Sequence, residues 1–255
     1  MEENNLEKIT KNGKALFLAY DHGLEHGVED FDDTSINPEK IIEIGNWNYF
    51  TGIILQKGIA EKYYRSGKDK VPLILKLNGK TNLLEEEDPY SPPICSVEEA
   101  VKLGAAACGY TVYIGSIHEA KMIAEFAQIE KECQSAGLPL IGWMYPRGRA
   151  VKGKELDPDI LAYAARVGLE IGAEMIKIPY TGDIDSFSRV VQAAGKTKVV
   201  VVGGQKKSEE VFLKMTEDIL ACGAIGLAVG RNVWQSEKPL EISRKIAERI
   251  FSNNC

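Results

Sequence analysis

Eight short apolar runs alternate along the chain with longer amphipathic stretches, and this alternation constrains the fold more than any other feature. Buried parallel strands read as near-continuous apolar runs, and helices between such strands are typical of βα units. Eight units in 255 residues predict a closed (β/α)8 TIM barrel, an α/β fold. The predicted strands are Ala15–Tyr20, Gly52–Gln56, Pro72–Leu77, Ala106–Ile114, Pro139–Met144, Glu174–Ile178, Lys198–Val202 and Ala224–Val229.

The main alternative is an open, doubly wound sheet, which usually has fewer strands and a Gly-x-Gly-x-x-Gly fingerprint after the first. No such fingerprint follows the first predicted strand, so the barrel is favoured. Ser96 and Glu99 form a capping-box pattern, and Asp157 precedes a proline suited to the first position of a helix. The predicted helices are Pro38–Asn48, a short segment near Ile59–Ser66, Ser96–Leu103, His118–Ala136, Asp157–Ile171, Asp183–Ala194, Ser208–Ala221 and Leu240–Phe251.

No long linker, low-complexity segment or shift in composition marks a second domain, so we expect residues 1–255 to form one domain. The one extended loop is Gly79–Cys95, which is expected above the strands.

A net charge of −6 without a basic run argues against nucleic-acid and anionic membrane partners, although a local positive field could still bind an anionic substrate. The polar N-terminus, the lack of an apolar run of about 20 residues and five cysteines without metal-site spacing predict a cytoplasmic protein that binds no metal.

Polar and glycine residues follow nearly every predicted strand at its carboxyl end, where barrel enzymes build their sites. Lys177 is the sharpest candidate, because it lies inside an apolar strand between two isoleucines. Burial lowers the pKa of a lysine and frees its amine to attack a carbonyl and form a Schiff base. A lysine that reaches solvent or pairs with a carboxylate would also fit. Lys76, in LILKLNG, is the second candidate nucleophile and could equally be a structural ion pair.

Two turns after the last two strands, Gly203-Gly204 and Gly230-Arg231, predict a phosphate-binding site. Barrels commonly bind phosphate at this position, and glycines let backbone N–H groups approach the anion. Ordinary turns would also fit each pair alone.

Tyr145 and Asp21 are the candidate acid and base groups. A phenol has an ordinary pKa of about 10, so it needs a cationic neighbour to titrate near neutrality, a role expected of Lys177 or Arg147. The structural alternative for Tyr145 is an interface aromatic, and that for Asp21 is a helix cap or a turn residue.

His22 and His26 stand four residues apart, with two acidic residues nearby, which is a spacing found in metal sites. Gly23 and Gly27 predict a loop here, which argues against a metal-binding helix.

Five strings together resemble the archaeal-type class I fructose-1,6-bisphosphate aldolases of the DhnA/DeoC-like group: LAYDHGLEHG, LILKLNGKTNL, GWMYPRG, EMIKIPYTGD and GLAVGRNVWQ. The resemblance covers essentially the whole chain. It implies reversible cleavage of fructose 1,6-bisphosphate to dihydroxyacetone phosphate and glyceraldehyde 3-phosphate, in glycolysis and gluconeogenesis, without metal or cofactor. It also implies a homo-oligomer, often a decamer.

Carried over by position, the resemblance implies that Lys177 is the Schiff-base lysine and that Tyr145 donates and accepts protons. Asp21 is implied as the carboxylate that assists carbinolamine chemistry and orients the lysine, and Trp143 as a residue that shapes the pocket. The residues implied at the ketose 1-phosphate are Gly203, Gly204, Gly230 and Arg231. Those implied at the hydroxyls and the distal phosphate are His22, His26, Lys57 and Arg147.

A sister activity in the same group is 2-amino-3,7-dideoxy-D-threo-hept-6-ulosonate synthase of aromatic amino-acid biosynthesis, which shares DHG, YPRG and YTGD. Trp143 and the LNGKTN block favour the sugar-phosphate branch. A sugar-phosphate binder without catalytic activity is a third hypothesis, since a fold does not determine a function.

Overall fold

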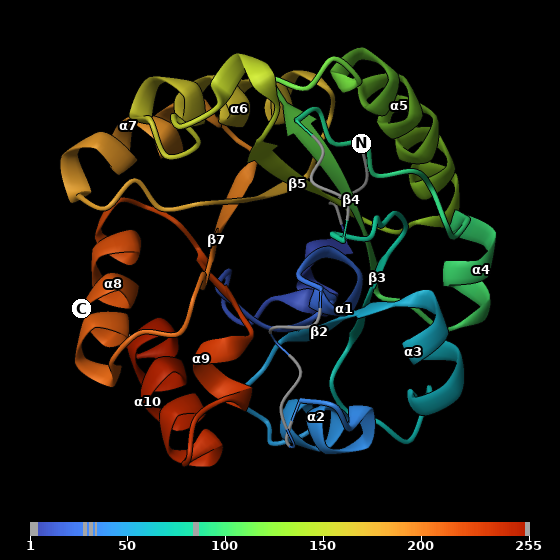
Figure 1. Ribbon diagram of the computed structural model, residues 1–255. Helices are drawn as coiled ribbons and strands as arrows, with labels where there is room; N and C mark the ends of the chain where they lie inside the picture. Colours follow the sequence, from blue (N-terminus) through green and yellow to red (C-terminus); the bar gives the residue numbers. More distant parts are fainter. Residues whose placement is uncertain (1–4, 28–29, 31–32, 34, 84–86, 253–255) are drawn as a thin grey trace.

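The computed structural model describes residues 5–27, 30, 33, 35–83 and 87–252, which form a closed barrel of parallel strands inside a ring of helices (Figure 1). Each strand pairs with its neighbours in sequence, and the last pairs with the first. The predicted TIM barrel is therefore confirmed. Its strands are β1 (Ala15–Tyr20), β2 (Gly52–Gln56), β3 (Leu73–Lys76), β4 (Ala107–Ile114), β5 (Leu140–Pro146), β6 (Met175–Ile178), β7 (Lys198–Val202) and β8 (Gly226–Val229).

The helices follow the predicted positions with small shifts at their ends. Helix α2 ends three residues before Asn48, and α3 begins directly after β2. Strand β5 runs beyond its predicted end because Tyr145 and Pro146 stay in register with β4. The helices are α1 (His22–Glu25), α2 (Pro38–Gly45), α3 (Lys57–Tyr63), α4 (Val97–Lys102), α5 (Glu119–Ala136), α6 (Pro158–Glu170), α7 (Ile184–Ala193), α8 (Glu209–Ala221), α9 (Arg231–Trp234) and α10 (Pro239–Phe251), with 3-10 turns at Asn5–Ile9 and Arg149–Val151.

The predicted helix caps are present. The Ser96 hydroxyl accepts a hydrogen bond from the Glu99 N–H, and the Glu99 carboxylate accepts one from the Ser96 N–H. The Asp157 side chain accepts from the N–H groups of Asp159 and Ile160 at the start of α6. These bonds satisfy backbone donors that the first turn of a helix leaves unpaired.

The histidine-containing segment differs from its prediction as a loop, because His22–Glu25 forms one helical turn, α1. The turn is closed by the His26 N–H, which donates to the His22 carbonyl at 2.8 Å. Gly27 then takes a left-handed conformation with φ 72°, so only the second glycine interrupts the helix. The result is that His22 and Glu25 are both buried at the mouth of the barrel.

The seam of the barrel depends on Gly226, which pairs with Ala15 where β8 meets β1. A Cβ atom at this position would lie 1.7 Å from the Ala15 carbonyl oxygen, and φ is 153°. A residue with a side chain would therefore separate the two strands that close the sheet.

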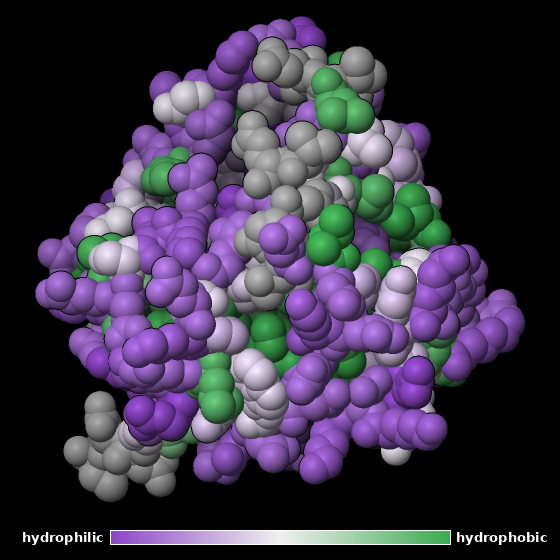
Figure 2. Space-filling model, turned by 60° about the horizontal axis from the view of Figure 1, so that its bottom comes forward, coloured by the Kyte–Doolittle hydropathy of each residue, from purple (hydrophilic) through white to green (hydrophobic). Residues whose placement is uncertain are grey.

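The face shown in Figure 2 is mainly hydrophilic, with hydrophobic side chains scattered among polar ones. Within the described ranges, no helix is long and apolar enough to cross a membrane.

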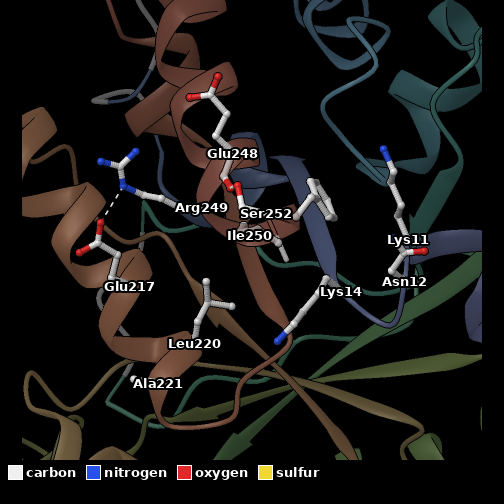
Figure 3. A pocket seen from close by; sticks show the side chains of 11 residues that line it. Lys11, Asn12, Lys14, Glu217, Leu220, Ala221, Glu248, Arg249, Ile250 and Ser252 are labelled. Atoms are coloured by element: carbon white, nitrogen blue, oxygen red, sulfur yellow. Dashed lines mark hydrogen bonds and ion pairs between the residues drawn. The ribbon is translucent and has the colours of Figure 1, made fainter. Parts of the chain in front are cut away.

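A cleft of about 730 Å³ lies at the amino-terminal ends of the strands, against the ends of α8 and α10 (Figure 3). Arg249 pairs there with Glu217 at 2.9 Å, and Lys14 extends toward Leu220. None of the predicted site residues lines this cleft. The chemistry must therefore be sought at the other end of the barrel.

Candidate active site

A pocket of about 360 Å³ opens at the carboxyl ends of the strands and gathers most of the predicted site residues. Parallel strands bring their carboxyl ends to one edge, so residues far apart in sequence meet there. Its lining includes Asp21, His22, Glu25 and His26 after β1, Tyr145 and Arg147 at the end of β5, Lys177 on β6, Gly204 after β7, and Gly230 and Arg231 after β8.

Lys177 lines this pocket and is only 4% exposed. Its strand pairs in register with β5, where Trp143 is its partner residue. The ammonium nitrogen lies 4.9 Å from the centroid of the Trp143 ring. Burial lowers the pKa of Lys177, and the nearby charge of Lys76 acts in the same direction, while Asp21 opposes it. These are the conditions under which a lysine becomes a nucleophile.

Asp21 follows β1 directly and is 8% exposed. Burial alone would raise its pKa, but the positive charges of Lys177 and Lys76 outweigh burial and lower the pKa to about 2. The carboxylate is therefore ionised throughout the neutral range. It provides a fixed negative charge beside the amine of Lys177.

Lys76 on β3 is fully buried, and its ammonium group forms an ion pair with Glu25 of α1. A second carboxylate oxygen, Oδ2 of Asp21, lies 3.6 Å from the same nitrogen. The structural ion pair that the sequence left open for Lys76 is therefore present. Because its amine is held by two carboxylates, Lys76 is poorly suited to attack a carbonyl.

We expect Lys76→Met to destabilise the protein by about 3–5 kcal/mol, because the substitution leaves the buried Glu25 carboxylate without its partner. Urea unfolding followed by tryptophan fluorescence measures the change. The matched control is the double variant Glu25→Gln/Lys76→Met, which removes both charges and should recover most of the loss. A single variant as stable as the wild type would contradict this view of the pair.

Tyr145 is 8% exposed at the end of β5. Burial raises its pKa well above the ordinary value, and the negative charges of Asp21 and Glu25 raise it further. The Arg147 guanidinium, 5.7 Å from the ring centroid, lowers it but does not prevail. The expectation that neighbouring cations would lower the pKa of the Tyr145 phenol toward neutral pH was therefore wrong. Tyr145 carries its proton, which suits it to donate.

Trp143 lies beneath the pocket and does not appear in its wall, since its side chain is 1% exposed. The ring occupies space left by Gly109 on β4, where a Cβ would lie 2.0 Å from the indole. Lys76 and Lys177 have their nitrogens 5.9 Å and 4.9 Å from its centroid. The π face of the indole therefore lies close to both lysine nitrogens and attracts each of them in its charged form.

The predicted phosphate turns are only partly at the pocket. Gly204, Gly230 and Arg231 line it, whereas the Gly203 N–H donates to the Ala228 carbonyl at 2.9 Å within the sheet. Gly203 therefore supports the cradle from behind.

Asn232 was missed as a site residue, although it follows Arg231 in the string GLAVGRNVWQ. Its amide donates to the carbonyls of Gly203 and Gln205, and its side-chain oxygen accepts from the Lys207 N–H. Asn232 thus fixes the turn after β7 to the turn after β8.

His22 packs face to face with Trp234 of α9, with ring centroids 4.6 Å apart. Burial lowers the pKa of His22 to about 4, so its imidazole is neutral at physiological pH. The Trp234 indole N–H donates to the Ala19 carbonyl at 3.1 Å, which ties α9 to the end of β1. Trp234 lines the pocket and was also missed, although it lies in the quoted string.

Lys57 does not reach the pocket. It is the first residue of α3, and its ammonium group binds Glu99 of α4 and lies 3.8 Å from Glu61. The hydrogen bond from Lys57 lowers the pKa of Glu99 to about 2. Its prediction as a substrate contact finds no support, because the side chain turns outward to the helical layer.

The protein-family model for DeoC/LacD family aldolases matches residues 15–236. The chain belongs to the DeoC/LacD family of aldolases. It is 50% identical over 98% of its length to a fructose-bisphosphate aldolase class 1 of Thermoproteus tenax, of which 95% is covered. A Halobacterium salinarum protein of the same name is 44% identical over 91% of this chain and 88% of its own.

Solved structures agree with this assignment. An archaeal fructose-1,6-bisphosphate aldolase whose catalytic lysine is covalently bound to a carbinolamine intermediate superposes with a TM-score of 0.92. The two sequences are 49% identical, over 97% of this chain and 98% of that one. A more distant relative, at 36% identity over 99% of this chain and 92% of its own, is a 2-amino-3,7-dideoxy-D-threo-hept-6-ulosonate synthase of Archaeoglobus fulgidus.

In the described part of this aldolase, no group of three histidine, cysteine, aspartate or glutamate side chains is placed to hold a metal ion. Glu25 and Glu155 are further carboxylates in the pocket wall that were not among the predicted site residues. Glu25 stands in LAYDHGLEHG, but the sequence offered it only as a neighbour of a metal site that we discounted. The ion pair with Lys76 of β3 shows that Glu25 belongs to the buried part of the site.

The low pKa of Asp21 makes a prediction for the stability of the aldolase at acid pH. A folded-state pKa of about 2, below the ordinary 3.8, stabilises the fold by about 2 kcal/mol above pH 4. This contribution is lost as the pH falls through the folded-state value. The difference in unfolding free energy between wild type and Asp21→Asn should therefore shrink by about this amount between about pH 5 and pH 2. A difference that is independent of pH would contradict the assignment.

Proposed function

We propose that this aldolase reversibly cleaves fructose 1,6-bisphosphate to dihydroxyacetone phosphate and glyceraldehyde 3-phosphate through a Schiff base on Lys177. The observation that supports this most strongly is the buried Lys177 amine, flanked by the ionised Asp21 and opening into a pocket that also holds Arg231. The relatives at 50% and 44% identity carry the name of this activity, and the synthase is more distant at 36%.

In the proposed mechanism the uncharged amine of Lys177 attacks the ketose carbonyl carbon, and the carbinolamine takes up one proton and loses water to give a protonated imine. The imine withdraws the electron pair of the adjacent carbon–carbon bond, which breaks as the neighbouring hydroxyl releases its proton to solvent and the aldehyde product leaves. An enamine remains on the lysine. The phenol of Tyr145, which holds its proton, protonates the enamine carbon, and water then releases the ketone.

Asp21 supports the charged stages of this sequence. Its carboxylate is ionised at neutral pH and lies close enough to influence the pKa of Lys177. It therefore orients the amine and stabilises the positive charge of the imine, as preorganised charges do in active sites. A carboxylate with so low a pKa is a weak base, so we assign proton transfer to the enamine carbon to Tyr145.

The phosphoryl group near the imine is proposed to bind at Gly204, Gly230 and Arg231, where glycine backbone and a guanidinium meet. Arg147 and the two histidines line the same pocket and are proposed to contact the sugar hydroxyls and the other phosphate.

The test combines two measurements on the purified protein. Cleavage of fructose 1,6-bisphosphate is followed by a coupled assay, and borohydride reduction in the presence of dihydroxyacetone phosphate is followed by intact mass and peptide mapping. The proposal expects turnover and one adduct on the peptide that contains Lys177. Turnover without an adduct would exclude the Schiff base, and an adduct without turnover would favour the synthase or another ketose.

We also propose that residues 1–255 form one domain that assembles as a homo-oligomer in the cytoplasm. Several large apolar side chains are exposed on the helices, namely Tyr163, Ile184 and Val211. The four cysteines in the described ranges are free, which fits a reducing compartment: Cys95, Cys108, Cys133 and Cys222. Light scattering coupled to gel filtration measures the assembly, and a monomer at micromolar concentration would refute it.

A further inference from the structure

Asp30 places a buried carboxylate among the residues of the active pocket. Its Oδ2 atom lies 2.5 Å from Nδ1 of His26 and 3.4 Å from a terminal nitrogen of Arg231. The residue is 8% exposed. Its backbone is held as well, since the Ser35 hydroxyl donates to the Asp30 carbonyl at 2.7 Å, and the Tyr20 hydroxyl donates to the Ser35 carbonyl.

Two groups assigned to different phosphates therefore converge on one oxygen atom. The family resemblance implied that Arg231 binds the ketose 1-phosphate and that His26 contacts the hydroxyls and the distal phosphate. A nitrogen of each lies within reach of the same carboxylate oxygen, so both can contact one anionic oxygen at this position. The carboxylate of Asp30 has the charge and the acceptor geometry of such an oxygen.

We propose that Asp30 is an internal anion that occupies the phosphoryl position between His26 and Arg231, and that it sets specificity by excluding simple anions. The proposal rests on the proposed function, because it takes the arriving group to be a phosphoryl group of the substrate. A phosphoryl group that approaches Arg231 meets a like charge until the Asp30 carboxylate moves away from the guanidinium.

Free phosphate and tethered phosphate differ in their ability to displace this carboxylate. Inorganic phosphate has only its own contacts to set against the Asp30–Arg231 pair. The phosphoryl group of a sugar that is bound to Lys177 is held at a high effective concentration, which favours displacement. Asp30 therefore weakens binding of inorganic phosphate more than binding of the bisphosphorylated substrate.

The test is the affinity of the full-length protein for inorganic phosphate, measured by calorimetry on wild type and Asp30→Asn. Removing one negative charge a few ångströms from the guanidinium should tighten phosphate binding about tenfold. Asp33→Asn is the matched control, because Asp33 is exposed on the same segment, and its affinity should equal that of the wild type. Asp30→Ala is measured in parallel, so that an asparagine which disturbs His26 or the fold does not decide the result.

Unchanged or weaker phosphate binding in both Asp30 variants would overturn the proposal, since a residue that merely positions His26 and Arg231 would weaken binding when removed. Kinetics provide a second readout. The KM for fructose 1,6-bisphosphate should fall less than the dissociation constant for inorganic phosphate, and an equal fall in both would remove the role in specificity. If the protein does not cleave the bisphosphate but both variants bind inorganic phosphate tighter, the proposed function fails and the internal anion stands.

Discussion

Replacing Lys177 by methionine should lower turnover of fructose 1,6-bisphosphate by at least about 10⁴-fold, because the variant has no amine to form the covalent intermediate. Methionine nearly matches the length of the lysine stem and has no charge. The fold should therefore tolerate it at a position that is 4% exposed against the Trp143 ring. Single-turnover kinetics with enzyme in excess over substrate gives the residual rate, and borohydride should produce no adduct with dihydroxyacetone phosphate.

Lys76 provides the matched comparison for this experiment. It lies on β3 and faces the same tryptophan ring, yet its amine is held by Glu25 and Asp21. In the double variant Glu25→Gln/Lys76→Met the adduct should still form on Lys177, even if turnover falls. An adduct that persists in Lys177→Met and disappears in the Lys76 variant would exchange the two roles.

Tyr145→Phe should lower the turnover number about 10²- to 10⁴-fold, the range expected when a positioned proton donor is removed. The substitution deletes one hydroxyl and keeps the ring, so KM should change little. Because the imine forms before the proposed proton transfer to the enamine, borohydride should still trap substrate on Lys177. Borohydride trapping with dihydroxyacetone phosphate tests imine formation, and rapid acid quench during cleavage should show accumulation of the enamine-bound form, which borohydride does not reduce.

Full turnover in Tyr145→Phe would remove the residue from the mechanism. Loss of trapping together with turnover would instead place Tyr145 in imine formation, a step that we assign to the region of Asp21. Arg147→Met is a useful companion, because it removes the cation that opposes the rise in the Tyr145 pKa without touching the phenol.

The barrel could be predicted because its signal is distributed over many residues. A run such as KVVVV can be buried on both faces only inside a sheet covered by helices, and eight such runs leave few other folds. The buried lysine of β6 was predictable for the same reason, since a charged residue within MIKI must face the interior of the barrel or the helical layer.

Contacts between loops and neighbouring helices were not predictable, because they depend on side-chain direction. Lys57 follows β2 at the expected end of the barrel, yet its side chain points to Glu61 and to Glu99, 42 residues away. The Asp30 contact with Arg231 joins the two ends of the sequence, and no local pattern encodes it. The pKa of Tyr145 is raised first by burial and then by the negative charges of Asp21 and Glu25, which the turn of α1 brings to the same end of the barrel.

Asp21, Glu25, Lys76 and Lys177 form a buried cluster whose net charge changes during the reaction. With the amine of Lys177 uncharged, two carboxylates face a single ammonium group, and the cluster carries one surplus negative charge. Conversion of the amine to an iminium ion cancels that charge, so the buried cluster is electrically balanced around the intermediate and unbalanced when the amine is free to attack. The barrel interior thus stabilises a positive charge on the nitrogen of Lys177, whichever ketone has reacted with it. The choice of substrate is left to the residues at the mouth of the barrel.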